Sequence, residues 1–202
     1  MNRNARILAA GATMLFALVL TTGNATARNL YRADGVYDDI DAIVKELKAA
    51  KVDEAKVKAA VAGIKKKHED LSELMTVYKP TGAKVKGIGW DPANKGKGDG
   101  IETHINDLAG KKALGKAQFA KEKELIRRAT YYNLAMYEIA KAYAPEKIKA
   151  GKGAKEWNKY NEEIKEGSKE VFAALEANDP AALKKAMGRI AAGCNECHTD
   201  FR

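Results

Sequence analysis

The sequence predicts an all-α fold: an antiparallel four-helix bundle with an extra N-terminal helix and a long Gly-rich loop. Three observations support this prediction. Apolar residues recur in steps of three and four along most of the chain, which is the period of one helix face. Only 4 of the 202 residues are Pro, and no segment alternates strictly between apolar and polar residues as a half-buried strand does. Helices of about 20 residues with such stripes pack at shallow angles, as in a helix bundle.

Capping residues and Pro mark where the helices begin and end. Asp53 is a suitable N-cap for the second helix, and Pro80 disfavours helical geometry at Lys79, where that helix ends. Asp179 and Pro180 are a start signal for the last helix, because they combine an acidic cap with Pro in the first turn. The expected helices cover residues 35–49, 53–78, 101–109, 117–143, 154–177 and 180–201.

The long connection is expected over residues 79–100. These residues include six Gly and two Pro, which interrupt regular structure. The Gly residues lack the spacing of a phosphate-binding loop and the Lys-Ser/Thr pair that follows it. We therefore expect a structural connection that lies over one end or side of the bundle.

The first 27 residues are typical of a secretory signal peptide. Two Arg residues supply the positive start, and an apolar run of fourteen residues extends from Ile7 to Leu20. A bilayer span needs roughly 20 such residues, and Ala25-Thr26-Ala27 offers small residues for cleavage soon after the run. We therefore expect a signal peptide at 1–27 and an exported, soluble helical domain at 28–202.

The chemistry of the chain is concentrated near its C-terminus, at Cys194-Asn195-Glu196-Cys197-His198. This sequence is C-x-x-C-H, the attachment motif of c-type haem. Positions i, i+3 and i+4 share one helix face, so the two thiols and the imidazole converge. We expect one haem c, attached through thioethers to Cys194 and Cys197 and ligated at its iron by His198. The three residues continue the apolar stripe of the last helix, which predicts a macrocycle inside the bundle.

Other uses of the motif have less support. A thioredoxin-like C-x-x-C needs a βαβ setting, which this sequence does not predict. A structural zinc site needs about four ligands, and only His68 and His104 could be added to the three residues of the motif. A disulfide between helix positions three apart has poor geometry. Because unmodified thiols of an exported protein face oxidation, haem attachment is the preferred interpretation.

The position of the motif distinguishes among haem proteins. Four residues follow it, so we expect no Met ligand downstream. A C-x-x-C-H-x-x-aromatic-Arg sequence on the last helix of a bundle resembles the cytochrome c′ family, the class II c-type cytochromes. The resemblance is specific at 194–202 and looser over the rest of 53–202, where only the helix pattern agrees. The helix at 35–49 and the loop at 79–100 depart from the family pattern.

The resemblance implies thioether links at Cys194 and Cys197, proximal ligation by His198, and a position for Arg202 near the proximal face. There the guanidinium would interact with a haem propionate or with the edge of the His. The resemblance also implies a periplasmic protein, often a homodimer. The family includes six-coordinate members that carry electrons and five-coordinate members that bind NO or CO. A one-electron carrier is therefore the first hypothesis, and an NO- or CO-binding protein with a vacant apolar distal site is the alternative.

Catalysis and nucleic-acid binding are not expected. No acid–base pair stands at a recognisable spacing, and a single haem adds little catalytic equipment. The formal net charge is +9, but Lys is interspersed with Glu and Asp along the helices, which is typical of solvated faces. A positive surface can still steer an acidic partner. We therefore expect a redox partner protein, for which an acidic surface is one option, and no nucleic acid.

The distal side of the iron offers few candidate ligands. The side chains on apolar stripes that are able to ligate iron are His68, Met75 and Met136. In the bundle of the family that this chain resembles, the first helix runs antiparallel to the last, so its N-terminal half faces the haem. The residues that the helix at 53–78 would bring to the iron are Val57, Val61 and Ile64, and those from 35–49 would be Ile40 and Ile43. Five-coordinate iron in an apolar pocket is therefore favoured, and the sixth ligand is left open between none and these three side chains.

Aromatic residues are expected around the haem. In an up-down-up-down bundle, the end of the last helix lies beside the end of the helix at 117–143 and the start of the helix at 154–177. The residues gathered at that end are Tyr131, Tyr132, Met136, Tyr143, Trp157 and Tyr160. We expect this set to line the haem at the end where His198 lies.

Overall fold

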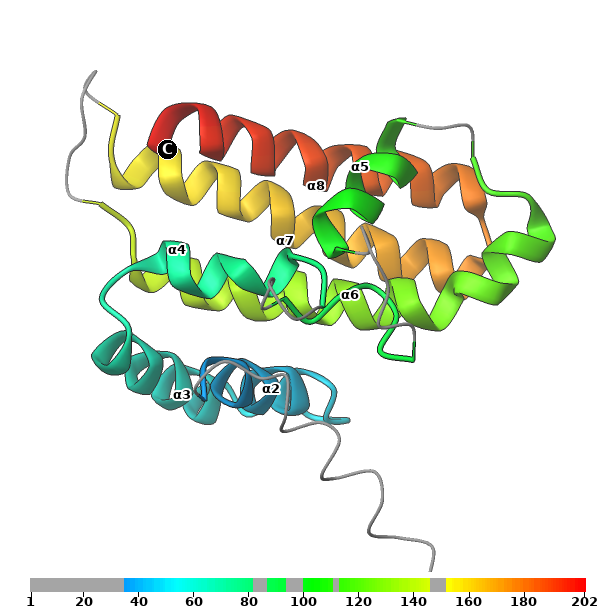
Figure 1. Ribbon diagram of the computed structural model, residues 1–202. Coiled ribbons are helices and arrows are strands. Elements are labelled where there is room, and N and C mark those ends of the chain that lie inside the picture. Colours follow the sequence, from blue (N-terminus) through cyan, green and yellow to red (C-terminus); the bar gives the residue numbers. More distant parts are fainter. Residues whose placement is uncertain (1–34, 82–86, 94–99, 111–112, 146–151) are drawn as a thin grey trace, which may run out of the picture. The chain divides into compact units, whose positions relative to one another are not determined.

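The computed structural model describes residues 35–81, 87–93, 100–110, 113–145 and 152–202. All regular elements in these ranges are helical, which confirms the predicted all-α class (Figure 1). The elements are α2 Val36–Leu47, α3 Glu54–Lys67, α4 Leu71–Leu74, the 3-10 helix η1 Met75–Tyr78, α5 Ile101–Gly110, α6 Lys116–Ala142, α7 Ala154–Ala177 and α8 Pro180–Phe201. None of these described helices is long and apolar enough to cross a bilayer. The predicted signal peptide at 1–27 lies outside the described residues.

The three longest helices, α6, α7 and α8, pack side by side and alternate in direction (Figure 1). Trp157, in the first turn of α7, donates from its indole Nε1 to the carbonyl of Ala140 near the end of α6, with an N···O distance of 2.8 Å. Arg127 of α6 pairs with Glu176 near the end of α7 at 2.9 Å. The chain reverses again before α8, so α6 and α8 run parallel to each other.

The fourth member of the bundle is the short helix α5, which packs against α8. Two further helices of more than ten described residues, α2 and α3, pack against each other and against α6. Tyr132 of α6 donates to Asp41 of α2 at 2.5 Å, and the Tyr143 hydroxyl donates to the His68 carbonyl at 2.6 Å. The predicted extra N-terminal helix therefore corresponds to α2. A second helix, α3, packs beside α2 on α6.

The prediction of one helix over 53–78 is wrong, because the chain leaves the helical conformation at His68. The backbone is extended at His68 (φ −127°, ψ 110°) and at Asp70 (φ −107°, ψ 118°). The Asp70 side chain accepts the Ser72 N–H at 2.8 Å and so begins α4. Apolar residues keep their helical spacing across this break. The Asp70 side chain, however, bonds to the backbone N–H of Ser72, and such a bond competes with continuation of the helix beyond its three final Lys residues.

Asp179 caps α8, the helix that carries the C-x-x-C-H motif. Its Oδ1 accepts the N–H groups of Ala181 at 2.9 Å and Ala182 at 3.0 Å. We expect Asp179→Ala to lower the free energy of unfolding by about 1 kcal/mol, because two N–H groups at the helix start lose their acceptor. Asp179→Asn keeps an acceptor oxygen and should cost much less. Denaturant unfolding of both variants checks this, and equal losses would show that capping is not the cause.

The described part of the Gly-rich connection is fastened to α6 by Arg128. Its Nη1 donates to the carbonyls of Gly89 at 3.0 Å and Trp90 at 2.9 Å. Its Nη2 donates to the carbonyl of Ile88 at 3.4 Å. The Trp90 ring stacks on His104 of α5, with centroids 4.2 Å apart. Residues 88–90 therefore join α5 to α6, which agrees with the predicted structural role of the connection.

We expect Arg128→Met to lower the free energy of unfolding by about 1–2 kcal/mol, because three partly buried carbonyls lose a charged donor. Arg127→Met is the matched control. That guanidinium pairs with the exposed carboxylates of Glu124 and Glu176, and such pairs contribute roughly 0–1 kcal/mol. Urea unfolding curves of the two variants compare them, and a loss at Arg127→Met as large as that at Arg128→Met would contradict the anchoring role.

Candidate haem-binding site

The last turns of α8 hold the C-x-x-C-H motif on a regular helix, as predicted. The side of α8 that faces the core carries the fully buried residues Leu183, Met187 and Ile190. Cys194 continues this side and packs against the core. Both cysteines are free and half-buried. Two thiols therefore stand one turn apart at the margin of the apolar interior.

Burial keeps both thiols neutral. Desolvation raises the pKa of Cys194 to about 12, and the neighbouring Cys197 and Glu102 add to the increase. Desolvation also raises the pKa of Cys197 to about 11, with a further contribution from Asp200. At neutral pH each sulfur therefore remains protonated and carries no charge into the apolar interior.

His198 follows the second thiol and lies on the exposed part of the same turn. In the described part of the chain, its imidazole has no hydrogen-bond or ion-pair partner. Its backbone carbonyl accepts the Arg202 N–H at 3.2 Å, which closes the helix. The imidazole is thus the one side chain of the motif that is both basic and available to a metal ion.

Aromatic and polar contacts hold this last turn against the start of α7. The Phe201 ring lies edge-on to Trp157, with centroids 5.0 Å apart, and 6.4 Å from Tyr160. The Tyr160 hydroxyl donates to Asp200 at 2.5 Å, and Lys152 donates to the same carboxylate. These two partners lower the pKa of Asp200. The end of α8 that carries His198 is therefore fixed in position.

The predicted aromatic set is only partly gathered here. Trp157 and Tyr160 reach the end of α8, but Tyr132 and Tyr143 contact the α2–α3 hairpin and its end. The Tyr131 ring packs on Phe172, far along α7 from Trp157, with centroids 4.9 Å apart. The expectation that all six residues line the haem is therefore wrong. The reason is that α2 and α3 cover one face of α6, so aromatic residues on that face point away from α8.

Tyr78 and Glu102 interact electrostatically with the Cys194 thiol, and the sequence did not assign them to the site. Burial raises the pKa of Tyr78 well above its ordinary value, and the charges of Cys194 and Glu102 contribute. η1 also contacts α5. Tyr78 lies on an apolar stripe just before Pro80, and this position is the sequence signal that could have indicated a buried residue near the site.

The candidate distal residues are distributed differently from the prediction. Val57, Val61 and Ile64 of α3 and Ile40 and Ile43 of α2 belong to the two helices that pack on α6, so the expectation that they approach the iron is wrong. His68 lies at the end of α3, and its Nδ1 is 3.0 Å from Glu73 Oε2.

The two Met candidates lie in different elements. Met75 opens η1, and at about three residues per turn it falls on the same side of that helix as Tyr78. Met136 is buried in α6. Arg202 is exposed at the end of the chain, so its position beside a propionate or the His stays a prediction.

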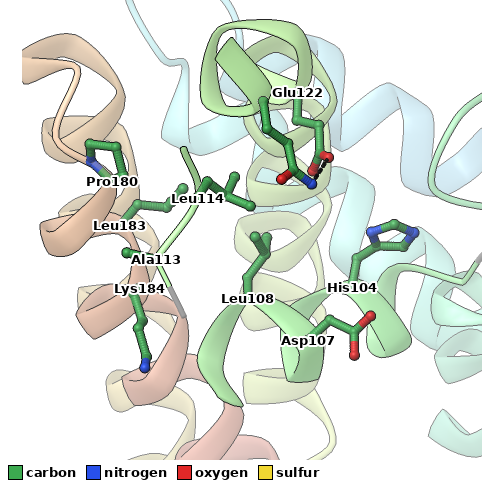
Figure 2. Close-up of a pocket in the computed structure, with 10 residues that line it drawn as sticks. His104, Asp107, Leu108, Ala113, Leu114, Glu122, Pro180, Leu183 and Lys184 are labelled. Carbon is green, nitrogen blue, oxygen red and sulfur yellow. Dashed lines mark hydrogen bonds between the residues drawn. The ribbon is translucent and has the colours of Figure 1, made fainter. Parts of the chain in front are cut away.

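A separate pocket of about 340 Å³ lies near the other end of α8 (Figure 2). Its lining includes Leu183 and Lys184 of α8, with His104, Asp107 and Leu108 of α5. Leu183 is about 16 Å from Cys194 along the helix, at about 1.5 Å per residue. This pocket is therefore distinct from the C-x-x-C-H face.

A helical bundle whose last helix ends in C-x-x-C-H defines the class of all-α proteins built to hold a c-type haem near the C-terminus. The chain belongs to the cytochrome c′ family: the family model described as cytochrome C′ matches residues 99–202, which include α5, α6, α7 and α8. No curated protein and no solved structure matches the chain. Family membership implies a haem cofactor. The helices α2 and α3 lie outside the part of the chain that the family model matches.

The residues present fit a haem. Two unpaired, neutral thiols at positions i and i+3 can each form a thioether, and an unpartnered imidazole at i+4 can ligate iron. The Cys194 thiol packs against apolar residues, which suit a macrocycle. In the described residues, no three His, Cys, Asp or Glu side chains form a group placed to hold a metal ion by themselves.

Proposed function

We propose that the protein is a periplasmic mono-haem c-type cytochrome that carries single electrons and is not an enzyme. The observation that supports this most directly is the position of Cys194, Cys197 and His198 on the last turns of α8, where Cys194 packs against the apolar core. When bound, the haem supplies an iron that changes between the ferric and ferrous states. The partner is a redox protein, for which an acidic surface would complement the positive charge of +7 that remains once residues 1–27, with their two Arg and no acidic residue, are removed from a chain of +9.

The role of each residue follows from its position. Cys194 and Cys197 fix the macrocycle to α8 through two thioethers, and His198 ligates the iron. The contacts of Phe201 with Trp157 and Tyr160 keep the last turn of α8 in place. A fixed ligand changes little between the two oxidation states, and a small rearrangement favours rapid electron exchange.

The second candidate function is reversible binding of NO or CO at a vacant iron position. One observation favours it: His68, a candidate sixth ligand, ends α3, and α3 packs on α2 and α6, whereas α8 packs on α5 and α7. Met75 and Met136 remain as alternatives for a six-coordinate carrier. A ferric spectrum with a methionine–iron band would favour the carrier, and Met75→Ala and Met136→Ala would identify the ligand.

The test is expression of the full chain in a bacterium that has a haem-attachment system. We expect the protein in the periplasmic fraction, cleaved after Ala27, with a mass increased by one haem under denaturing conditions. Optical spectra of the ferric and ferrous protein, with and without NO, then separate the two candidate functions. A denatured chain without added mass would overturn the proposal. A homodimer is the option that the family offers, and sedimentation measures the oligomeric state.

A further inference from the structure

Asn133, in the middle of α6, has an unusual environment. Its side chain is only 1% exposed, and neither its Nδ2 nor its Oδ1 has a hydrogen-bond partner in the described part of the chain. The other buried polar side chains each bond to a carbonyl four residues earlier: Thr130, Asn161 and Ser168. Because buried polar groups nearly always have partners, the Asn133 amide indicates a group that the described part of the chain does not supply.

Asn133 stands at the level of Cys194 along the bundle. Trp157 of α7 contacts both Ala140 of α6 and Phe201 of α8, so Ala140 and Phe201 lie at the same height along the bundle. Asn133 lies seven residues before Ala140, and Cys194 lies seven residues before Phe201. Because α6 and α8 run parallel, both are displaced from that height by about 10 Å in the same direction. An independent contact agrees. Ile164, seven residues beyond Trp157 on α7, is one of the residues against Gly193 of α8.

The direction of the Asn133 side chain is set by its neighbours on α6. Tyr132 points to α2, where it donates to Asp41. Tyr137 points to α7, where its hydroxyl donates to Glu162 at 2.5 Å. At about 100° per residue, Asn133 lies between these two directions, on the side of α6 that faces the interior of the bundle. Cys194 faces the same interior from α8.

We propose that Asn133 is the hydrogen-bonding residue of the haem pocket. Its Nδ2 donates to an acceptor oxygen that the haem brings into the bundle, which is either a propionate carboxylate or the diatomic ligand on the iron. The proposal rests on haem attachment as proposed above. In this proposal α6 contributes a hydrogen-bond donor to the haem pocket, in addition to the residues of the C-x-x-C-H motif on α8.

The test compares Asn133→Leu with unaltered protein, both carrying haem. Leu has a similar volume but cannot donate. Thr130→Val is the matched control, because Thr130 is buried one turn away on α6 and its hydroxyl already bonds to Ile126 at 2.8 Å. Three quantities are measured: the haem mass on the denatured chain, the infrared C–O band of the ferrous CO complex, and the reduction potential as a function of pH.

We expect full haem attachment in all three proteins. If the acceptor is the iron ligand, the C–O band of Asn133→Leu moves and CO dissociates roughly two- to tenfold faster, the range for loss of one hydrogen bond. If the acceptor is a propionate, the band stays and the pH dependence of the reduction potential changes. The proposal is overturned if Asn133→Leu carries haem and matches Thr130→Val in both quantities. Absence of haem from the unaltered protein would overturn this proposal together with the proposed function.

Discussion

The His198→Ala protein is expected to keep its haem but to lose the spectrum of a His-ligated iron in both oxidation states. The thioethers to Cys194 and Cys197 do not depend on the imidazole, so the mass of the denatured chain should still include one haem. The iron, in contrast, loses its imidazole ligand, because no other imidazole shares this turn of α8. Optical spectra of the ferric and ferrous forms, recorded with the denaturing mass, measure both consequences.

His68→Ala is the control for this experiment. His68 lies at the junction of α3 and α4, where its ring is 3.0 Å from Glu73. The variant loses one partly exposed contact, so we expect unfolding free energy to fall by less than about 1 kcal/mol and the spectra to stay unchanged. Unchanged spectra of His198→Ala would show that His198 is not a ligand. Changed spectra of His68→Ala would instead restore His68 as the sixth ligand.

The three long helices could be predicted closely from the sequence. α7 spans Ala154–Ala177 and α8 spans Pro180–Phe201, as expected. Each of these helices has a continuous apolar stripe, and the turn between them has local signals: Asn178 adopts a left-handed conformation (φ 51°) and Asp179 caps the next helix. Signals of this kind act within a few residues, so they do not depend on the rest of the fold.

The N-terminal half was harder to predict, because its arrangement is decided by tertiary contacts. The stripe through Ile64, His68 and Leu71 has helical spacing, yet the chain breaks at His68 and α3 packs on α6. The Tyr143 hydroxyl bonds to the carbonyl that this break leaves free, at 2.6 Å. Tyr143, which is far from His68 in the sequence, thus stabilises the break. The spacing of apolar residues does not indicate such a contact.

The candidate site divides in the same way. Cys194, Cys197 and His198 were found because the chemistry of the motif is contained in five consecutive residues. Tyr78 of η1 interacts electrostatically with Cys194, and we place Asn133 of α6 at the level of Cys194; both relations depend on how these elements pack. A buried amide is also invisible in sequence, because Asn on a helix is as compatible with solvent as with a cofactor pocket.

The contact between α7 and α8 beside the motif depends on Gly193. A Cβ at this position would lie 3.1 Å from the Tyr160 carbonyl oxygen, 3.2 Å from Ile164 Cγ1 and 3.3 Å from Glu163 Cβ. The nearest of these atoms is backbone and cannot rotate away. The two helices can therefore approach this closely only because residue 193 has no side chain. Gly167 of α7 likewise allows α7 and α8 to approach each other about one helix turn further from the motif. A Cβ at Gly167 would lie 2.7 Å from Ile190 Cγ1 of α8.

We expect Gly193→Leu to lower the free energy of unfolding by about 3 kcal/mol, at the upper end of the range for overpacking, because even the first carbon is too close. Gly188→Leu is the matched control in the same helix. Nothing lies within 4 Å of a Cβ at Gly188, so replacing Gly there should stabilise α8 by up to about 1 kcal/mol through helix propensity.

Unfolding by urea separates the two variants, since the same substitution should change stability in opposite directions. Because Gly193 directly precedes Cys194, the displaced helix would also carry the thiols and His198 away from α7. We therefore expect the spectra of the haem protein to change in Gly193→Leu and not in Gly188→Leu. If both variants were stabilised equally, the close approach of α7 and α8 at this level would be ruled out. Equal stability losses would point to side-chain size on α8 in general as the cause.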